Sequence, residues 1–237
     1  YRDSNRRKKE VILGVLYENF KSIPIDNEEI SQSELNIDNK TRSNLFCWNG
    51  QFSPQFIETM LKKYAKQDFL VLDPFLGSGT TVSECARLGI SAYGVELNVS
   101  AFWMAKTYEC SNLSLMERWR IVAEVDKIIS LIPNNENILD YILQGIKRND
   151  DIMVTNILST LVIVMDVYKN AITIELVNIK WEWLKNLILT LPYSEEKICV
   201  NRGDSRNIAL NDSVADMVIT SPPYINVFNY HQKYRTS

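Results

Sequence analysis

The stretch FLVLDPFLGSGTT, residues 69–81, is the feature that most limits what this chain of 237 residues can fold into. Its apolar start has the length and composition of a buried strand. The residues after the glycines are apolar at helical spacing, and Gly89 is a suitable C-cap for that helix. Residues 91–97, SAYGVEL, are typical of the next strand. Strand, glycine turn, helix and strand in this order predict a βαβ unit, and therefore a parallel sheet in an α/β fold.

Helices and short strands are predicted on both sides of this unit. Ser53 is a good N-cap, and Pro54 suits the first turn of a helix that follows it. Further along, apolar spacing predicts one helix that ends at Pro133 and another over residues 152–168. Residues 172–190 fit either a strand or a helix, and their length favours a helix. The segments EKICV and VADMVIT then predict two more short strands that end in polar loops.

Composition excludes several classes of protein. With 46% apolar residues, five Trp and eleven Tyr, the chain is too apolar to be disordered, and its length suits one domain with or without an insertion. No apolar run reaches the roughly 18 residues that span a membrane. The four Cys are scattered and there is one His, so we expect no metal site and a cytoplasmic protein with reduced thiols. The net charge of -3 argues mildly against a nucleic-acid binder.

The glycine turn is expected to hold a ligand, and three ligands compete for it. A phosphate-binding loop would need a Lys that is absent here, so ATP and GTP are disfavoured. A dinucleotide fingerprint would need a third Gly where Val82 stands. S-adenosylmethionine has no phosphate groups and needs only a turn of small residues, with Asp73 facing its ammonium group and Glu96 facing its ribose. Gly77 and Gly79 would let it approach the backbone, although the same glycines also fit a tight turn without a ligand.

A second motif, Ser221-Pro222-Pro223-Tyr224, directly follows a predicted strand. Two prolines lack N–H groups, so their backbone presents carbonyl acceptors without competing donors. Together with the Ser221 hydroxyl, these carbonyls form an acceptor pocket for an amino group, and Tyr224 offers a flat face on which a base stacks. At a strand end in the same sheet as the glycine turn, the motif favours a site for an extruded base over a plain proline turn.

Taken together, these motifs resemble the amino-group DNA methyltransferases, which produce N4-methylcytosine or N6-methyladenine. DPFLGSGTT resembles the cofactor motif of that family, and TSPPY resembles its catalytic motif. Three shorter segments are similar to the family pattern as well: GQFSPQFIETML, GVELN and RGDSRNI. The resemblance covers residues 45–105 and 197–230. It implies a Rossmann-like methyltransferase sheet, partial in this chain and carrying a helical insertion, in a protein that uses S-adenosylmethionine and binds DNA.

The resemblance also implies a role for each residue that matches a motif. The methionine half of S-adenosylmethionine would be held by Phe52, Ser53, Asp73, Pro74, Phe75, Gly77, Gly79 and Thr80. Glu96 would bind its ribose, and Asp204 would bind the amino group of its adenine. The target base would be held by Ser221, Pro222, Pro223 and Tyr224. Ser53 is also explained as a helix cap, and Glu96 and Asp204 also fit exposed acids at strand ends.

The implied reaction is methyl transfer to an exocyclic amino group of a DNA base. Hydrogen bonds from that amino group to Ser221 and to the Pro222 carbonyl would bring its nitrogen toward sp³ geometry, so catalysis rests on positioning and electrostatics. Ser before Pro-Pro-Tyr favours N4 of cytosine, with N6 of adenine as the alternative, and a restriction-modification system is the expected setting. A different class stays open as well: a non-catalytic interaction subunit or a degenerate methyltransferase half.

Four segments are predicted along the chain. They are a polar arm (1–43), a cofactor-binding part (44–109), a helical insertion (110–196) and a continuation with the catalytic loop (197–237). The insertion carries twelve acidic and eight basic residues, which is a poor surface for a phosphate backbone, so we expect it to serve packing, dimerisation or partner binding. The family's sheet has further strands after the catalytic motif. We therefore expect a missing C-terminal half or a second subunit to complete the sheet and supply the basic DNA-contacting surface.

Overall fold

The computed structural model describes residues 26–36, 45, 46, 48, 50–133 and 137–222. The chain forms two compact units, residues 1–32 and 33–237, and the second unit holds the sheet. Along the chain the elements are α2 (Gln32–Leu35), α3 (Pro54–Tyr64), β1 (Leu70–Asp73), α4 (Thr80–Leu88), β2 (Ser91–Glu96), α5 (Val99–Lys106), η2 (Thr107–Asn112), α6 (Leu115–Ser130), α7 (Ile138–Arg148), α8 (Ile152–Val164), α9 (Ile174–Thr190), β3 (Ile198–Arg202) and β4 (Met217–Val218).

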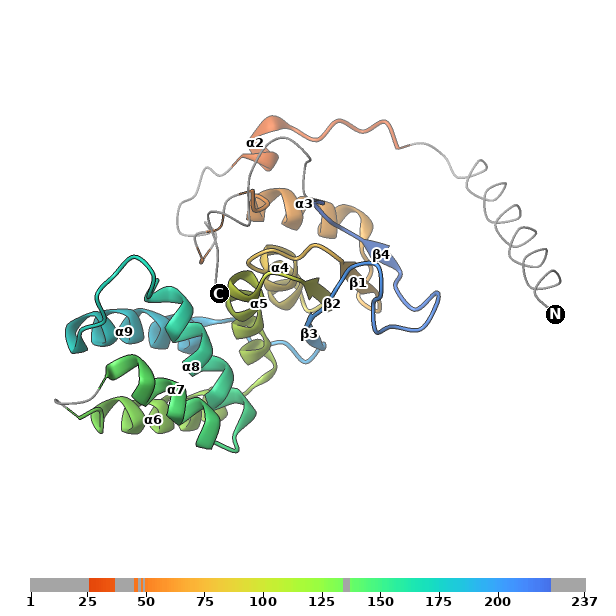
Figure 1. Cartoon of the computed structure of the whole chain (residues 1–237). Coiled ribbons are helices and arrows are strands. Elements are labelled where there is room, and N and C mark those ends of the chain that lie inside the picture. Colours follow the sequence, from red (N-terminus) through yellow and green to blue (C-terminus); the bar gives the residue numbers. More distant parts are fainter. Residues whose placement is uncertain (1–25, 37–44, 47, 49, 134–136, 223–237) are drawn as a thin grey trace. The chain divides into compact units, whose positions relative to one another are not determined.

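Four parallel strands form the sheet in the order β3-β2-β1-β4 (Figure 1). The chain passes from β1 to β2 and β3, and then returns to place β4 on the other side of β1, so the strand order reverses beside β1. Leu70 of β1 pairs with Ser91 of β2, and Val71 pairs with Met217 of β4. In open α/β sheets, ligands bind outside the carboxyl ends of the strands at such a reversal. The predicted α/β class and parallel sheet are confirmed.

The helix α3 begins, and the helix α4 ends, where the sequence predicts. The Ser53 hydroxyl caps α3 by accepting the N–H three residues further on at 3.3 Å, and Pro54 is the first helical residue. α4 lies between Gly79 and Gly89, which both have left-handed backbone conformations. Apolar side chains from α3, β1 and α4 join one core: Ile57, Leu61, Val71, Val82, Cys85 and Ala86. Tyr64, at the end of α3, is 45% exposed.

In the described part of the chain, α5, η2 and α6 to α9 separate β2 from β3. Three predicted helices correspond to α6, α8 and α9, and the ambiguous residues 172–190 are helical. α5, η2 and α7 have no counterpart in the prediction. Met116 and Trp119 of α6 are apolar but 82% and 53% exposed. The buried residues of α6 include the charged Arg118, which is 2% exposed.

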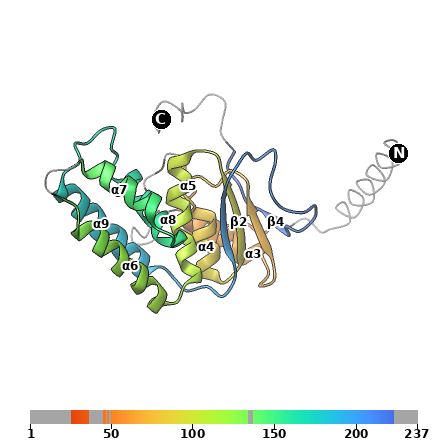
Figure 2. The same cartoon turned by 60° about the horizontal axis from the view of Figure 1, so that its bottom comes forward.

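Buried polar contacts join the group α6 to α9 to the elements beside the sheet. Figure 1 and Figure 2 show these helices together on the side of α5 and away from β4. The hydroxyl oxygens of Thr107 and Thr160 lie 3.1 Å apart, and the Thr160 hydroxyl donates to the Trp103 carbonyl at 2.8 Å. Arg118 donates to five backbone carbonyls, those of Ser111, Leu113, Ile188, Leu191 and Pro192. None of the helices in the described residues has the length and apolar character to cross a membrane.

The outer edge of β3 is closed by side chains, beginning with Asn112 at the end of η2. Its amide oxygen accepts the N–H of Ile198 at 2.9 Å. Its amide nitrogen donates to the carbonyls of Glu196 at 2.7 Å and Ser194 at 3.0 Å. One side chain therefore satisfies three backbone groups at the start of an edge strand, where an extra strand would otherwise bind them.

Two further side chains continue this closure toward the other end of β3. The Glu109 carboxylate accepts the N–H of Val200 at 2.7 Å. Lys106 donates to the carbonyl of the same residue at 2.8 Å and pairs with Glu109 at 2.7 Å. Because the N–H of Ile198 and both backbone groups of Val200 already have partners, β3 is a poor template for pairing with another chain.

Replacing Asn112 by Ala should therefore lower the free energy of unfolding by about 2–3 kcal/mol, because three backbone groups lose their partner. Denaturant unfolding of the variant would measure the change. Asn186→Ala is the matched control, since Asn186 is exposed on α9 and its loss should change stability by no more than about 0.5 kcal/mol. Equal stabilities of the two variants would contradict the role given to Asn112.

Candidate active site

The turn between β1 and α4, residues 74–79, lies at the carboxyl end of β1, where the strand order reverses. The N–H of Leu76 donates to the Val95 carbonyl at 3.0 Å, and the N–H of Gly77 donates to the Glu96 carboxylate at 2.7 Å. Gly77 and Gly79 have φ angles of 58° and 100°, a region that glycine adopts without strain. Two hydrogen bonds thus tie the turn to the end of β2 and fix its shape.

Glu96, the last residue of β2, holds the turn with one carboxylate oxygen and the following loop with the other. Its Oε2 accepts from Gly77, and its Oε1 accepts the N–H of Asn98 at 2.7 Å. Burial raises the pKa of this carboxyl, and the hydrogen bonds from backbone N–H groups oppose that rise. The N–H of Leu97 is a third donor to this carboxyl, so about one of its roughly four acceptor positions stays open for a further donor. An acceptor at a strand end fits a hydroxyl of a ribose.

Asp73, the last residue of β1, is 2% exposed and accepts three hydrogen bonds from its own chain. Its Oδ1 accepts the N–H of Phe75 at 3.1 Å and the hydroxyl of Thr220 at 2.8 Å. Its Oδ2 accepts the hydroxyl of Thr81 at 2.6 Å. Burial raises the pKa of this carboxyl, and the three donors counter the rise. The carboxylate links the turn, α4 and the end of β4, and its contact with a cofactor ammonium group stays a prediction.

Asp204 lies two residues beyond β3, beside the end of β2. The N–H of Gly203 donates to the Glu96 carbonyl at 3.2 Å, which holds the two strand ends together. The guanidinium of Arg206 donates to both carboxylate oxygens of Asp204, at 3.0 Å and 2.6 Å, and lowers the pKa of Asp204 to about 2. An adenine amino group would share this carboxylate with Arg206 or displace it. The sequence motif did not predict that competition.

The three predicted acids thus stand at the carboxyl ends of three adjacent strands. Asp73 ends β1, Glu96 ends β2, and Asp204 follows β3. The register aligns Asp73 with Gly94 and Glu96 with Arg202, so each acid lies two residues further along than the acid on the preceding strand. An elongated ligand with hydrogen-bond donors spaced along its length could contact all three carboxyl groups.

Two aromatic side chains occupy the space that the missing Cβ atoms of the turn leave. A Cβ on Gly77 would lie 3.3 Å from the indole of Trp48, and a Cβ on Gly79 would lie 2.7 Å from the ring of Tyr108. The side chains of Trp48 and Tyr108 therefore fill the space beside the missing Cβ atoms, and the expectation that Gly77 and Gly79 let a ligand approach the backbone stays a prediction.

The remaining residues predicted to contact the cofactor surround the turn. Phe75 is 36% exposed, Pro74 is partly buried, and Thr80 is buried at the start of α4. The ring of Phe52 stacks on Phe56 with a centroid distance of 5.5 Å.

The segment before α3 is attached to the turn by a hydrogen bond that the sequence did not indicate. The hydroxyl of Ser78 donates to the Gln51 amide oxygen at 2.7 Å. Ser53, next to this contact, donates its hydroxyl to the Leu35 carbonyl at 3.2 Å and accepts from the start of α3. Its position as a helix cap is confirmed, and its contact with a cofactor stays a prediction.

The proline motif begins at the carboxyl end of β4, next to the turn. The N–H of Ile219 donates to the Leu72 carbonyl at 3.1 Å, and the next residue, Thr220, bonds to Asp73. Ser221 and Pro222 follow directly, while Pro223 and Tyr224 lie outside the described residues. Two motifs more than a hundred residues apart in sequence therefore meet at the ends of adjacent strands.

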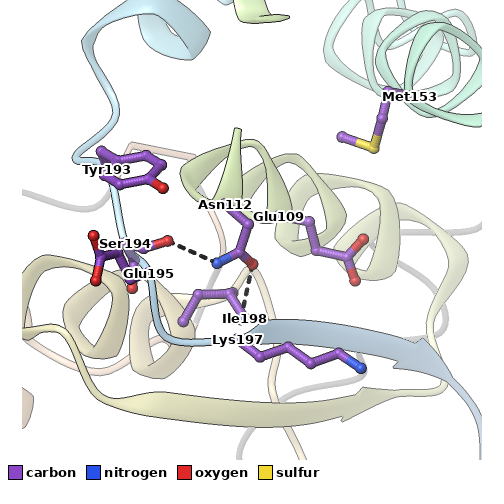
Figure 3. A pocket seen from close by; sticks show the side chains of 8 residues that line it. All are labelled: Glu109, Asn112, Met153, Tyr193, Ser194, Glu195, Lys197 and Ile198. Carbon is purple, nitrogen blue, oxygen red and sulfur yellow. Dashed lines mark hydrogen bonds between the residues drawn. The ribbon is translucent and has the colours of Figure 1, made fainter. Parts of the chain in front are cut away.

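A separate pocket of about 390 Å³ lies near the amino end of β3 (Figure 3). Its lining consists of Glu109, Asn112, Met153, Tyr193, Ser194, Glu195, Lys197 and Ile198. Within this lining, the side chains of Asn112 and Glu109 are bonded to the edge of β3, and the Ser194 hydroxyl donates to the Glu196 carbonyl at 3.0 Å. Within the described residues, no group of three or more His, Cys, Asp or Glu side chains could hold a metal ion.

Comparison with known proteins agrees with this geometry. Residues 2–107 match the model of the N6_N4_Mtase family, described as DNA methylase. The match includes the glycine turn and Glu96, and it also extends over residues expected to form a polar arm. A stretch of 51 residues is 37% identical to the type II methyltransferase M.MjaII of Methanocaldococcus jannaschii. It makes up 22% of this chain and spans only 10% of the relative's length.

A solved structure gives a weaker likeness. The rRNA methyltransferase aviRa from Streptomyces viridochromogenes superposes with a TM-score of 0.36 and 13% sequence identity, over 83% of this chain and 68% of that chain. A likeness of this size implies nothing about the substrate.

Gly79→Ala should lower the free energy of unfolding by about 2–4 kcal/mol, because the new Cβ meets the Tyr108 ring and the residue must keep a φ near 100°. Gly145→Ala is the control: Gly145 lies inside α7, and its Cβ would meet its nearest atom at 3.4 Å. That change should leave stability unaltered or raise it by up to about 1 kcal/mol. Thermal and urea unfolding of both variants give the comparison, and a neutral Gly79→Ala would contradict the tight packing of the turn.

Proposed function

We propose, from the match of residues 2–107 to the DNA methylase family, that this chain carries the cofactor-binding and catalytic segments of an S-adenosylmethionine-dependent DNA methyltransferase. The observation that carries the proposal is the 2.8 Å hydrogen bond between Thr220 and Asp73. It joins the start of the proline motif to the end of the strand that leads into the glycine turn. A methyl donor held at the turn and an amino group held by the proline motif would then lie next to each other.

The residues at the strand ends fit the parts of S-adenosylmethionine. Glu96 offers a carboxylate acceptor to a ribose hydroxyl, and Asp204 offers an acceptor to the adenine amino group one strand further along. We assign Phe52, Phe75 and the backbone of the turn to the methionine half. When bound, this cofactor supplies an electrophilic methyl group on a sulfonium sulfur.

Ser221 and Pro222 are the residues we assign to the acceptor base. The Ser221 hydroxyl and the Pro222 carbonyl accept hydrogen bonds from the exocyclic amino group, which directs its lone pair toward the turn. Such an amino group reaches the pocket only when its base has left the duplex. With Ser before the two prolines we favour N4 of cytosine as the acceptor, and N6 of adenine is the alternative.

The setting of the reaction is part of the same proposal. DNA is the proposed substrate, in the cytoplasm, and the type II methyltransferase named above supports a place in a restriction-modification system. The chain has a net charge of -3, so a basic surface for the DNA backbone would come from additional polypeptide. The comparisons give no support for a second subunit, and that part of the expectation stays a prediction.

Glu96→Gln should raise the Kd for S-adenosylmethionine at least about tenfold, because a charged acceptor of the ribose hydroxyls is lost. Isothermal calorimetry measures the Kd, and thermal unfolding shows whether the variant is folded. Glu182→Gln serves as the control, since that side chain is 66% exposed on α9 and should leave the Kd unchanged. Unchanged binding by a folded Glu96→Gln protein would remove Glu96 from the site.

Incubation of DNA with the protein and S-adenosylmethionine should yield 4-methylcytosine, detected by mass spectrometry of the digested nucleosides. Ser221→Ala should reduce the yield by about 10²-fold or more while leaving the Kd for the cofactor unchanged, because it removes an acceptor used by the base alone. Recovery of 6-methyladenine only would establish the adenine alternative. Cofactor binding without any methylated base would favour the non-catalytic reading of the chain.

A further inference from the structure

Three aromatic residues from distant parts of the chain form a continuous line of contacts that ends at the glycine turn. Tyr108 of η2 packs against Gly79, and its ring lies edge-on to Phe46 with a centroid distance of 5.9 Å. Phe46 in turn lies edge-on to Trp183 of α9 at 5.5 Å. Phe46 and Tyr108 are buried, whereas Trp183 is 40% exposed. The outermost member of the line therefore belongs to the helical segment between β2 and β3.

The segment that carries Phe46 is the one that covers the turn. Its described residues, 45, 46, 48 and 50–53, are neither helix nor strand, so side-chain contacts decide where the segment lies. Phe46 is held between Tyr108 and Trp183, and two residues later Trp48 packs on Gly77. Gln51 accepts the hydroxyl of Ser78. Phe52, which we assign to the methionine half of the cofactor, follows these anchors directly.

α9 offers a fixed support for this segment. The indole N–H of Trp181 donates to the Asp126 carboxylate of α6 at 2.6 Å, and Lys185 pairs with the same carboxylate at 3.1 Å. Arg118 of α6 holds the carbonyls at the end of α9. Trp183, between Trp181 and Lys185 in sequence, is therefore presented by a helix that is bonded to its neighbour along its length.

We propose that Trp183 is a positioning residue for cofactor binding, acting through Phe46 on the segment that covers the methionine half of S-adenosylmethionine. The inference rests on the proposed function. It gives the helical segment a role in the site: α9 sets the position of the described residues 45, 46, 48 and 50–52 over the glycine turn. Tyr108 connects Phe46 to the turn, because its ring packs against both Gly79 and Phe46. Its hydroxyl is hydrogen-bonded to Ser83 of α4.

Titration of the 237-residue protein with two probes tests the proposal: S-adenosylmethionine, and adenosine, which lacks the methionine half. Trp183→Ala should raise the Kd for S-adenosylmethionine about three- to tenfold, as expected for the loss of one edge-to-face aromatic contact. The Kd for adenosine should not change. Trp183→Phe keeps an aromatic edge and should restore most of the affinity. Ile179→Ala, one turn away on α9 and 58% exposed, should bind both probes like the wild type.

Each result has a distinct meaning. Equal affinity of Trp183→Ala and wild type for S-adenosylmethionine would overturn the positioning role and leave the proposed function intact. An equal loss for both probes would also overturn it, because a general loosening of the fold would weaken adenosine as well. A wild-type protein that binds neither probe would overturn the proposed function together with this inference. Thermal unfolding of each variant confirms that the titrated protein is folded.

Discussion

The buried carboxylate of Asp73 is the interaction on which the arrangement of the site depends. It accepts donors from the turn, from α4 and from the residue after β4, and thereby holds three chain segments at the end of one strand. Burial of a carboxylate is costly unless its oxygens accept hydrogen bonds. The Asp73 carboxylate therefore depends on its three donors, and the three segments depend on the carboxylate to hold them together. Packing these segments around Asp73 buries its carboxyl, and the burial raises its pKa. The three hydrogen bonds oppose that rise.

The sequence predicts the parts of this fold that local chemistry decides. Ser53 and Pro54 begin α3, Gly89 ends α4, and the apolar runs become β1 and β2, because caps, left-handed glycines and buried strands each leave a local pattern. The placement of Glu96 at the end of β2, beside the turn, also followed from the order of motifs. Its hydrogen bond to the Gly77 N–H did not, since it depends on how far the turn folds back across β2.

The parts that the sequence did not predict are decided by contacts between distant segments. Arg118 is charged but buried, because carbonyls at the end of α9 accept its hydrogen bonds, whereas the apolar Met116 and Trp119 of the same helix are exposed. Trp48 and Tyr108 fill the space beside Gly77 and Gly79, and no local sequence pattern predicts these contacts. Arg206 is two residues from Asp204 in sequence, but the sequence did not predict that its guanidinium would compete with a ligand for the Asp204 carboxylate.

The closed edge of β3 has a consequence for how the helical segment can vary. Lys106, Glu109 and Asn112 belong to α5 and η2, so these two elements take the place of a strand on that side of the sheet. A shortening that removed them would expose the backbone groups of β3 and invite pairing between molecules. Loss or exchange of α7, which supplies none of these side chains, leaves that edge covered. Deletions in this segment are therefore expected to have unequal effects. Those that reach back to Asn112 or beyond uncover the edge of β3, whereas those confined to later residues do not.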